Sequence, residues 1–325
     1  MRKLRYAIYG LPYYISISYW RKNYKNIITT FFAIFGLAWT FVEAANHFKM
    51  AIAVPETTPL SFSLLLLIGF VLSLLINFPK LIHIVTIADT DIKVELLVAN
   101  YLNLEGDKVL STNSTFDTTH SDNFISPKSV QGQFYKKYYK SISHLDNDLT
   151  NSLANETPIM TLNRTKSKNQ QYSIGTVAKL THIKNAPFWK VWSDDIEFRS
   201  YWLAMADVNE FGKPTSNFEN LQVSLGELWQ FVATKGHLEN LIIPILGSGR
   251  TGINEKRERI LQEIIFSFVA FASENKTRKL TEKLTIAIHP SDLLKHDINF
   301  YELCGFIEFT CKFKSSKNFG RSQGI

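Results

Sequence analysis

Residues 245–252 read ILGSGRTG, in which three glycines are spaced as Gly-x-Gly-x-x-Gly. The preceding NLIIPIL (240–246) is typical of a buried strand, and residues 254–275 repeat apolar side chains at helical spacing. A glycine-rich loop between a strand and a helix lets the backbone approach a phosphate and directs amides towards it. The sequence therefore predicts a phosphate-binding loop of six residues: Gly247, Ser248, Gly249, Arg250, Thr251 and Gly252.

The position of this loop argues against two common nucleotide motifs. It lacks the Gly-Lys-Ser/Thr of a Walker A loop. A Rossmann fingerprint opens the first strand–helix unit and has an acidic residue about 20 positions later, at the end of the next strand. Here the loop comes late, the next strand ends in His289-Pro290, and Pro244 fits a central Rossmann strand poorly. A phosphate loop of another kind and a tight turn without ligand remain open.

Two apolar stretches predict a membrane hairpin. Residues 27–46, IITTFFAIFGLAWTFVEAAN, contain Glu43 as their only charge, and residues 60–78, LSFSLLLLIGFVLSLLINF, contain none. A helix of about 20 residues spans the hydrocarbon core of a bilayer, and a second span argues against a cleaved signal peptide. We therefore expect a two-helix transmembrane hairpin over residues 26–80. Ordinary span composition explains its small residues, which would also permit close helix contact: Gly36, Ser61, Ser63, Gly69 and Ser73.

Basic residues indicate the orientation of the hairpin. Positions 1–25 contain six of them and no acid, which accounts for nearly all of the net charge of +7. Basic flanks remain on the cytoplasmic side, so both termini are expected in the cytoplasm, with segment 1–25 along the inner leaflet. The basic tail, 313–325, has no accompanying recognition module, so no nucleic-acid partner is expected.

The remaining chain predicts one α/β domain over residues 81–312. Candidate strands alternate with amphipathic helices, and this order is typical of layered α/β folds. The expected strands are 94–102, 107–113, 171–180, 198–207, 240–246 and 284–290, and the expected helices are 134–154, 218–234 and 254–275. Residues 155–171 are polar without periodicity and are expected to form a loop.

Catalytic and metal-binding patterns are weak. The histidines are scattered without a His-x-x-x-His pair, and Cys304 and Cys311 form no Cys-x-x-Cys motif. Asp194-Asp195 lies in a polar stretch, where paired carboxylates are usually solvated. We assign no catalytic residue, no metal site and no cofactor.

Several stretches, in order, resemble a macro domain, the module that binds ADP-ribose. DKVLSTNSTFDT (107–118) resembles the strand that ends in the family's asparagine, here Asn113, and ISPKSVQGQF (125–134) stands where its first binding loop lies. YSIGTV (172–177) and YWLAMAD (201–207) resemble later strands, and IPILGSGRTGI (243–253) resembles its diphosphate loop. The resemblance implies a three-layer α/β/α sandwich. Implied ligand contacts are Asn113, Ser129, Val130, Gln131, Gly132 and Gln133, together with the glycine loop. Asp117, four residues after Asn113, is the one acid expected near the distal ribose, and capping of a turn over residues 116–119 is an equal alternative for it.

Two positions depart from the family pattern. The first strand often ends in Gly-Asp-Ile, whose aspartate contacts adenine, whereas this chain has Ala99-Asn100-Tyr101. Asn100 offers both a donor and an acceptor, so it is the expected adenine contact. The first loop has only Gly132 where many ADP-ribosyl hydrolases have a run of glycines, which favours binding over hydrolysis.

A macro domain behind two spans resembles the effectors of type II Thoeris anti-phage systems. That resemblance implies a TIR-domain partner that makes a histidine-conjugated ADP-ribose, which the macro domain binds. It also implies a homo-oligomer that disrupts the bacterial inner membrane, without enzymatic activity. Two alternatives remain: a membrane-tethered ADP-ribosyl hydrolase, and a membrane receptor for a protein partner.

Overall fold

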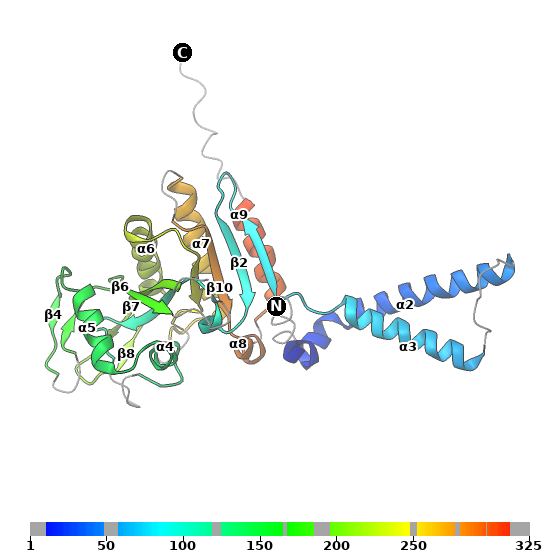
Figure 1. Ribbon diagram of the computed structural model, residues 1–325, viewed down its shortest axis with the longest axis horizontal. Coiled ribbons are helices and arrows are strands. Elements are labelled where there is room, and N and C mark those ends of the chain that lie inside the picture. The colour runs from blue at the N-terminus through cyan, green and yellow to red at the C-terminus, as the bar shows by residue number, and fades with distance from the viewer. Residues whose placement is uncertain are drawn as a thin grey trace, which may run out of the picture. The chain divides into compact units, whose positions relative to one another are not determined.

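The computed structural model describes residues 11–48, 58–118, 125–164, 168–184, 196–247, 252–276, 280–296 and 298–312. The chain divides into two compact units, Met1–Leu81 and Ile82–Ile325. The first contains two long helices and the second an α/β domain (Figure 1). Some predicted features lie outside the described residues: Ser248, Gly249, Arg250, Thr251, the Asp194-Asp195 pair and the basic tail.

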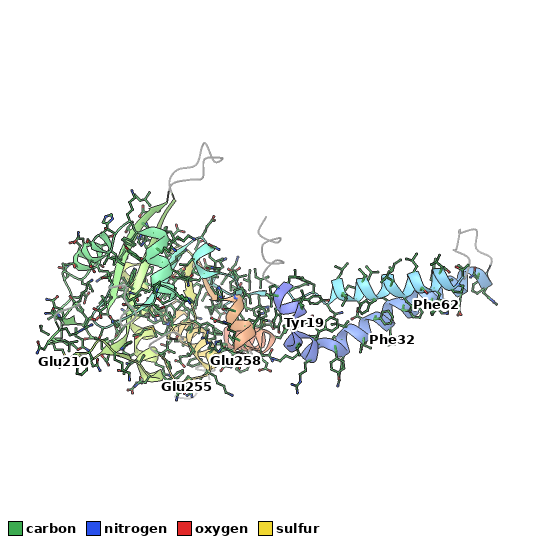
Figure 2. The ribbon with its side chains drawn as sticks, turned by 90° about the horizontal axis from the view of Figure 1, so that it is seen from below. Tyr19, Phe32, Phe62, Glu210, Glu255 and Glu258 are labelled. Atoms are coloured by element: carbon green, nitrogen blue, oxygen red, sulfur yellow. The ribbon has the colours of Figure 1, made fainter. Side chains whose placement is uncertain are left out.

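The first unit contains α2 (Ile17–His47) and α3 (Pro59–Ile76), which cover most of the two predicted spans. α2 begins well before residue 27 because the Ser16 hydroxyl accepts a hydrogen bond from the Tyr19 amide and caps the helix. Thr58 caps α3 in the same way. By length and composition, both helices could cross a membrane. Beyond the exposed basic residues Arg21, Lys22 and Lys25, many large apolar side chains of these helices are exposed, Phe32 and Phe62 among them (Figure 2).

Small residues bring the two helices together. The Ser73 hydroxyl is buried and donates a hydrogen bond of 2.6 Å to the Ile27 carbonyl. A Cβ atom on Gly69 would lie 3.6 Å from the Phe31 ring, so this glycine faces the neighbouring helix closely. At Gly36, by contrast, a Cβ atom would meet nothing within 4 Å. Gly69 and Ser73 therefore serve contacts inside the hairpin.

An eight-stranded sheet forms the centre of the second unit, in the order β1-β2-β10-β9-β3-β7-β6, with β8 paired to β7. The strands from β2 to β7 in this order run parallel, and β1 and β6 are antiparallel to their neighbours. The bounds are β1 (Ile82–Thr86), β2 (Lys93–Val98), β3 (Asp107–Asn113), β6 (Val177–Lys184), β7 (Ile196–Val208), β8 (Pro214–Thr215), β9 (Leu241–Pro244) and β10 (Lys283–Ile288). The carboxyl ends of the parallel strands therefore meet at one edge of the sheet, where open α/β folds place their ligands.

Helices cover both faces of the sheet (Figure 1). α4 (Val130–Tyr138) and α5 (Ile142–Ser152) lie on one face, and α6 (Phe218–Lys235), α7 (Arg257–Glu274) and α9 (Phe300–Lys312) lie on the other. Successive residues of a strand point to opposite faces. On β7, Trp202 packs edge-on against Phe134 of α4, and Tyr201 packs against Phe231 of α6. The predicted three-layer α/β/α sandwich is confirmed.

Some elements differ from the prediction because local side chains end or restart them. The single helix expected over 134–154 is two helices, since Ser141 caps a new one at the His144 amide. The strand expected over 94–102 ends at Val98, after which Asn100 caps the short turn η1 (Tyr101–Asn103). The expected loop 155–171 contains a small hairpin of β4 (Met160–Thr161) and β5 (Gln170–Gln171). Further elements that were not predicted are β1, β8, α8 (Pro290–Lys295) and α9.

Candidate functional site

A cavity of about 220 Å³ lies at the carboxyl ends of β2, β9 and β10, beside the first turn of α4. We call it the edge cavity. It brings together predicted ligand contacts from two segments that are 30 residues apart: Asn100 after β2, and Val130 and Gln133 in α4. The lining residues are Asn100, Tyr101, Leu102, Lys128, Val130, Gln133, Pro244, Ile245, Ala287, His289, Ser291 and Asp292.

The glycine loop begins two residues after Ile245 in the cavity wall. Gly247 has a φ of +64°, and a Cβ atom there would lie 2.3 Å from Cδ1 of Ile253. The backbone conformation therefore favours glycine at this position, and any side chain would also have to displace the end of Ile253. The Ile253 amide donates to the Gly247 carbonyl at 3.2 Å, which holds the two ends of the loop together. Gly252, at the far end, is exposed and has a φ of +44°.

The first turn of α4 forms one side of the edge cavity. Ser129 caps the helix by accepting a hydrogen bond of 3.0 Å from the Gly132 amide. A Cβ atom on Gly132 would lie 2.4 Å from the Ser126 carbonyl oxygen, so glycine permits the loop to pass close to the helix. The positive end of the helix dipole is thereby presented beside the cavity, where it favours an anion.

The same turn also reaches a second polar group. Gln131 donates from Nε2 to the Asp117 carbonyl at 3.0 Å, whereas Val130 and Gln133 line the cavity. Asn113 and Asp117 are not among the lining residues. The first turn of α4 thus connects the edge cavity to the loop that follows β3.

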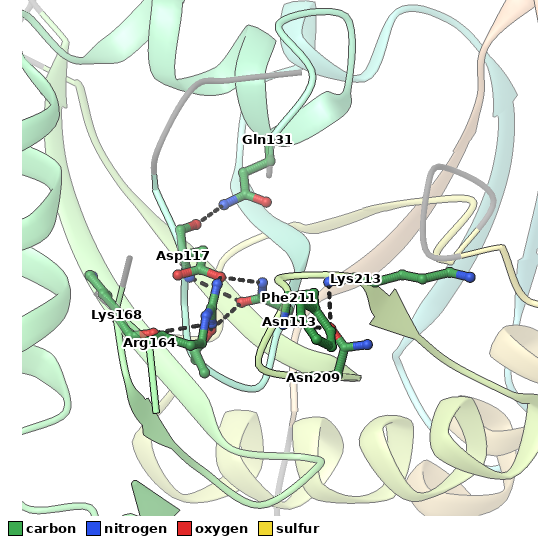
Figure 3. A network of polar contacts seen from close by, with 9 residues as sticks. Asn113, Asp117, Gln131, Arg164, Lys168, Asn209, Phe211 and Lys213 are labelled. Carbon is green, nitrogen blue, oxygen red and sulfur yellow. Dashed lines mark hydrogen bonds and ion pairs between the residues drawn. The ribbon is translucent and has the colours of Figure 1, made fainter. Parts of the chain in front are cut away.

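Four residues around that loop form what we call the Asn113 cluster: Asn113, Thr115, Asp117 and Arg164 (Figure 3). The Asn113 carbonyl oxygen Oδ1 accepts from the Asp117 amide at 3.0 Å and from the Thr115 hydroxyl at 3.2 Å. Its Nδ2 donates to Asp117 Oδ2 at 2.9 Å. Arg164 Nη2 lies 3.0 Å from the same carboxylate oxygen. Both side chains of this ion pair are almost fully buried.

The Asp117 carboxylate also has one unsatisfied oxygen. Oδ1 is buried and has no hydrogen-bond partner within the described part of the chain. A buried acceptor without a partner is unfavourable and is usual only where a water, ion or ligand completes the site. The predicted contacts Asn113 and Asp117 therefore already bond each other, and one acceptor is left over.

Four polar residues of the cavity wall were not predicted as ligand contacts: Lys128, His289, Ser291 and Asp292. His289 follows β10, which is parallel to β2 and β9, so the rule that such strand ends meet could have found it. His289 Nδ1 accepts from the Ser291 amide at 3.2 Å, which makes it a helix cap. Asp292 is paired with Arg257 at 2.6 Å.

The aromatic wall of the cavity has a structural role. The Tyr101 hydroxyl donates to the Val109 carbonyl at 2.7 Å. Burial, with a smaller contribution from Tyr138, raises the pKa of Tyr101 well above its ordinary value, so the hydroxyl remains protonated. Within the described ranges, no three His, Cys, Asp or Glu side chains gather as metal ligands. The cavity combines apolar walls with amide, hydroxyl, imidazole and ammonium groups, a combination suited to holding a polar organic ligand.

Comparison with known families agrees with this architecture. The sequence profile described as "Thoeris protein ThsA, Macro domain" matches residues 94–289, more than half of the chain. The chain belongs to the ThsA macro-domain family of Thoeris proteins. The matched region runs from β2 to His289 and therefore contains the edge cavity's strands, the Asn113 cluster and the glycine loop.

Individual relatives are more distant. The Thoeris protein ThsA of Bacillus amyloliquefaciens (strain Y2) is 28% identical over 209 residues, which cover 61% of this chain and 62% of that protein. Two solved structures of the Oceanobacillus iheyensis macrodomain, one with ADP and one with MES bound, match at a TM-score of 0.43 and 11% identity. Each match covers 70% of this chain and 97% of the solved one. The family assignment therefore rests on the sequence profile.

Proposed function

We propose that this protein is a membrane-anchored anti-phage effector whose macro domain binds an ADP-ribose-type signal. The observation that carries the proposal is the edge cavity, which gathers Asn100, Val130 and Gln133 at the carboxyl ends of parallel strands in a ThsA-family macro domain. The expected ligand is a histidine-conjugated ADP-ribose made by a TIR-domain partner. Thoeris membership supports that partnership, in which the small molecule connects the two proteins.

The chemistry of the cavity fits the parts of such a ligand. Asn100 offers a donor and an acceptor to an adenine edge. The α4 N-terminus, Lys128 and the glycine loop that follows Ile245 favour a diphosphate. The Asn113 cluster, connected through Gln131, would then lie beyond the diphosphate, towards the second ribose.

The output of the proposed effector is mechanical. Two apolar helices, α2 and α3, anchor the chain in the inner membrane with both termini cytoplasmic. Ligand binding favours a self-associated state only to the extent that the ligand binds that state more tightly. Association of the hairpins would then permeabilise the bilayer. A Cβ atom on Gly36 would meet none of the described atoms within 4 Å, so this position would permit close approach of another helix.

Calorimetry tests the binding step directly. Full-length protein in lipid nanodiscs is titrated with ADP-ribose and with its histidine conjugate. We expect heat of binding with both and tighter binding of the conjugate. The absence of heat with either ligand would contradict the proposal and favour a receptor for a protein partner.

We further propose that the domain binds without catalysing. One Ser–His pair, Ser291 and His289, lies in the cavity wall, but its imidazole Nδ1 also accepts the Ser291 amide as a helix cap. That amide bond occupies the lone pair that a general base would need. Incubation with ADP-ribosylated protein should therefore release no free ADP-ribose. Steady release would establish the hydrolase alternative.

A further inference from the structure

Arg164 lies far from the predicted ligand contacts in sequence, between β4 and β5. Its guanidinium nevertheless reaches the loop after β3. Nη2 pairs with Asp117 at 3.0 Å, and Nη1 donates to the Thr115 hydroxyl at 3.2 Å and to the Lys168 carbonyl at 3.1 Å (Figure 3). The arginine side chain is only 2% exposed, so it is not a surface ion pair. Its bonds fix two residues that in turn contact Asn113.

The bonds of the cluster determine which way the Asn113 carboxamide faces. Asp117 and Thr115 present donors to its oxygen, and the Asp117 carboxylate presents an acceptor to its nitrogen. A rotated amide would place oxygen against carboxylate and would lose these bonds. Arg164 contacts both Asp117 and Thr115, so it stabilises this one orientation.

The loop itself needs such support. Phe116, between the two anchored residues, has a φ of +51°, a conformation that a non-glycine residue adopts only when the surrounding structure enforces it. Its ring is fully buried against Tyr172, 5.7 Å away at 81°. Burial of Phe116 and the bonds of Arg164 therefore both stabilise the same turn.

We propose that Arg164 is a positioning residue, which orients Asn113 for the second ribose of the ligand through Asp117 and Thr115. The inference rests on the proposed function. It predicts that Arg164 governs the discrimination between ADP-ribose and ADP, because ADP lacks the second ribose. A residue that merely stabilised the fold would affect both ligands alike.

The test compares both ligands on full-length protein in nanodiscs. Arg164→Lys keeps the charge but loses the two-pronged contact. We expect the Kd for ADP-ribose to rise about tenfold, as for one misaligned hydrogen bond, and the Kd for ADP to stay within about twofold. Arg199→Lys is the matched control. Arg199 is paired with Glu197 at 2.7 Å near the amino end of β7, whereas Asn113 lies beside the carboxyl end of that strand. Its substitution should change neither Kd.

A second variant tests the same role without altering a buried charged side chain. Thr115→Val is nearly isosteric and removes the hydroxyl that joins Arg164 to Asn113. It should weaken ADP-ribose binding about threefold and leave ADP binding unchanged. Unchanged binding of both ligands in these variants, or equal weakening of both, would overturn the positioning role. A wild-type protein that binds neither ligand would instead overturn the proposed function, and this role with it.

Discussion

At the residue scale, Gly247 combines a conformational and a steric requirement. Its φ of +64° is one that other residues rarely adopt, and a Cβ atom there would have to displace the end of the Ile253 side chain. Gly247→Ala should lower the free energy of unfolding by about 1–3 kcal/mol, because the loop must adopt strained backbone or move Ile253. Thermal unfolding of the full-length protein in detergent measures this.

Gly226 provides the control for that substitution. It lies within α6, and a Cβ atom there would meet nothing within 4 Å. Gly226→Ala should therefore raise the free energy of unfolding by about 0.5–1 kcal/mol through helix propensity. If the two variants proved equally stable, the requirement at Gly247 would be refuted.

Val130 allows the cavity to be tested without disturbing the core. It is 38% exposed in the first turn of α4 and lines the edge cavity. Val130→Glu should weaken ADP-ribose binding by about 10- to 100-fold, because an unpaired negative charge a few ångströms from a diphosphate is repulsive by a few kcal/mol. Titration calorimetry gives the Kd. Val223→Glu, the same change at an exposed position of α6, should leave the Kd for ADP-ribose unchanged. An equal loss of affinity in both variants would show that the edge cavity is not the binding site.

His182 predicts a pH dependence of stability. Its imidazole is buried, and Nε2 lies 2.7 Å from the Ser200 hydroxyl. Burial, with a smaller contribution from Lys108, lowers its pKa from 6.5 to about 4. The unfolded chain therefore binds a proton at a pH where the folded chain does not, so stability is complete above pH 6.5 and falls as the pH drops towards 4. The loss amounts to about 3 kcal/mol.

Comparison with His182→Gln isolates this effect. Burial is the main cause of a raised pKa at Asp107, so this carboxyl group increases the stability of the folded state as the pH falls, opposite to the effect of His182. The difference in unfolding free energy between wild type and variant should therefore shrink by about 3 kcal/mol from pH 7 to pH 4. A difference that is independent of pH would refute the lowered pKa.

Part of the candidate site could be predicted from the sequence. Asn100, Val130 and Gln133 were predicted as ligand contacts, and the structure places them in one cavity. Arg164 could not be predicted, because it lies in a polar stretch without periodicity and acts through a tertiary contact with Asp117. Long-range ion pairs of this kind leave no local signal in one sequence.

At the element scale, long periodic segments were predictable and their ends were not. β3, α6 and α7 lie close to where apolar spacing placed them. The helix expected over 134–154 is divided because Ser141 begins a new helix, which apolar spacing alone does not reveal. α9 was missed although it buries Phe300, Leu303 and Ile307, since it follows a strand that was taken as the last element.

The hydrogen bond between Ser73 of α3 and Ile27 of α2 can be tested by mutation. Ser73→Ala removes the buried hydrogen bond to Ile27 and should lower the stability of the hairpin by about 0.6 kcal/mol, an average value for such bonds in membranes. Ser63→Ala is the control, since the Ser63 hydroxyl is exposed and donates within its own helix, to the Pro59 carbonyl at 2.8 Å. Unfolding of the two variants in mixed micelles provides the comparison. Equal stability of the two would show that the contact does not hold the helices together.

At the scale of the whole molecule, the chain joins a hairpin unit to a macro domain. Composition and order alone predicted both units, because apolar spans and alternating strands and helices are strong signals. Coupling between the units is the step on which the proposed effector depends. A ligand that binds the domain without changing its association would leave the membrane intact.

The most direct test uses full-length protein in liposomes that contain a self-quenched dye. Addition of histidine-conjugated ADP-ribose should release the dye in a concentration-dependent manner, and the Val130→Glu protein should require about 10- to 100-fold more ligand. Absence of release at ligand concentrations that saturate binding, or equal release without ligand, would contradict the account.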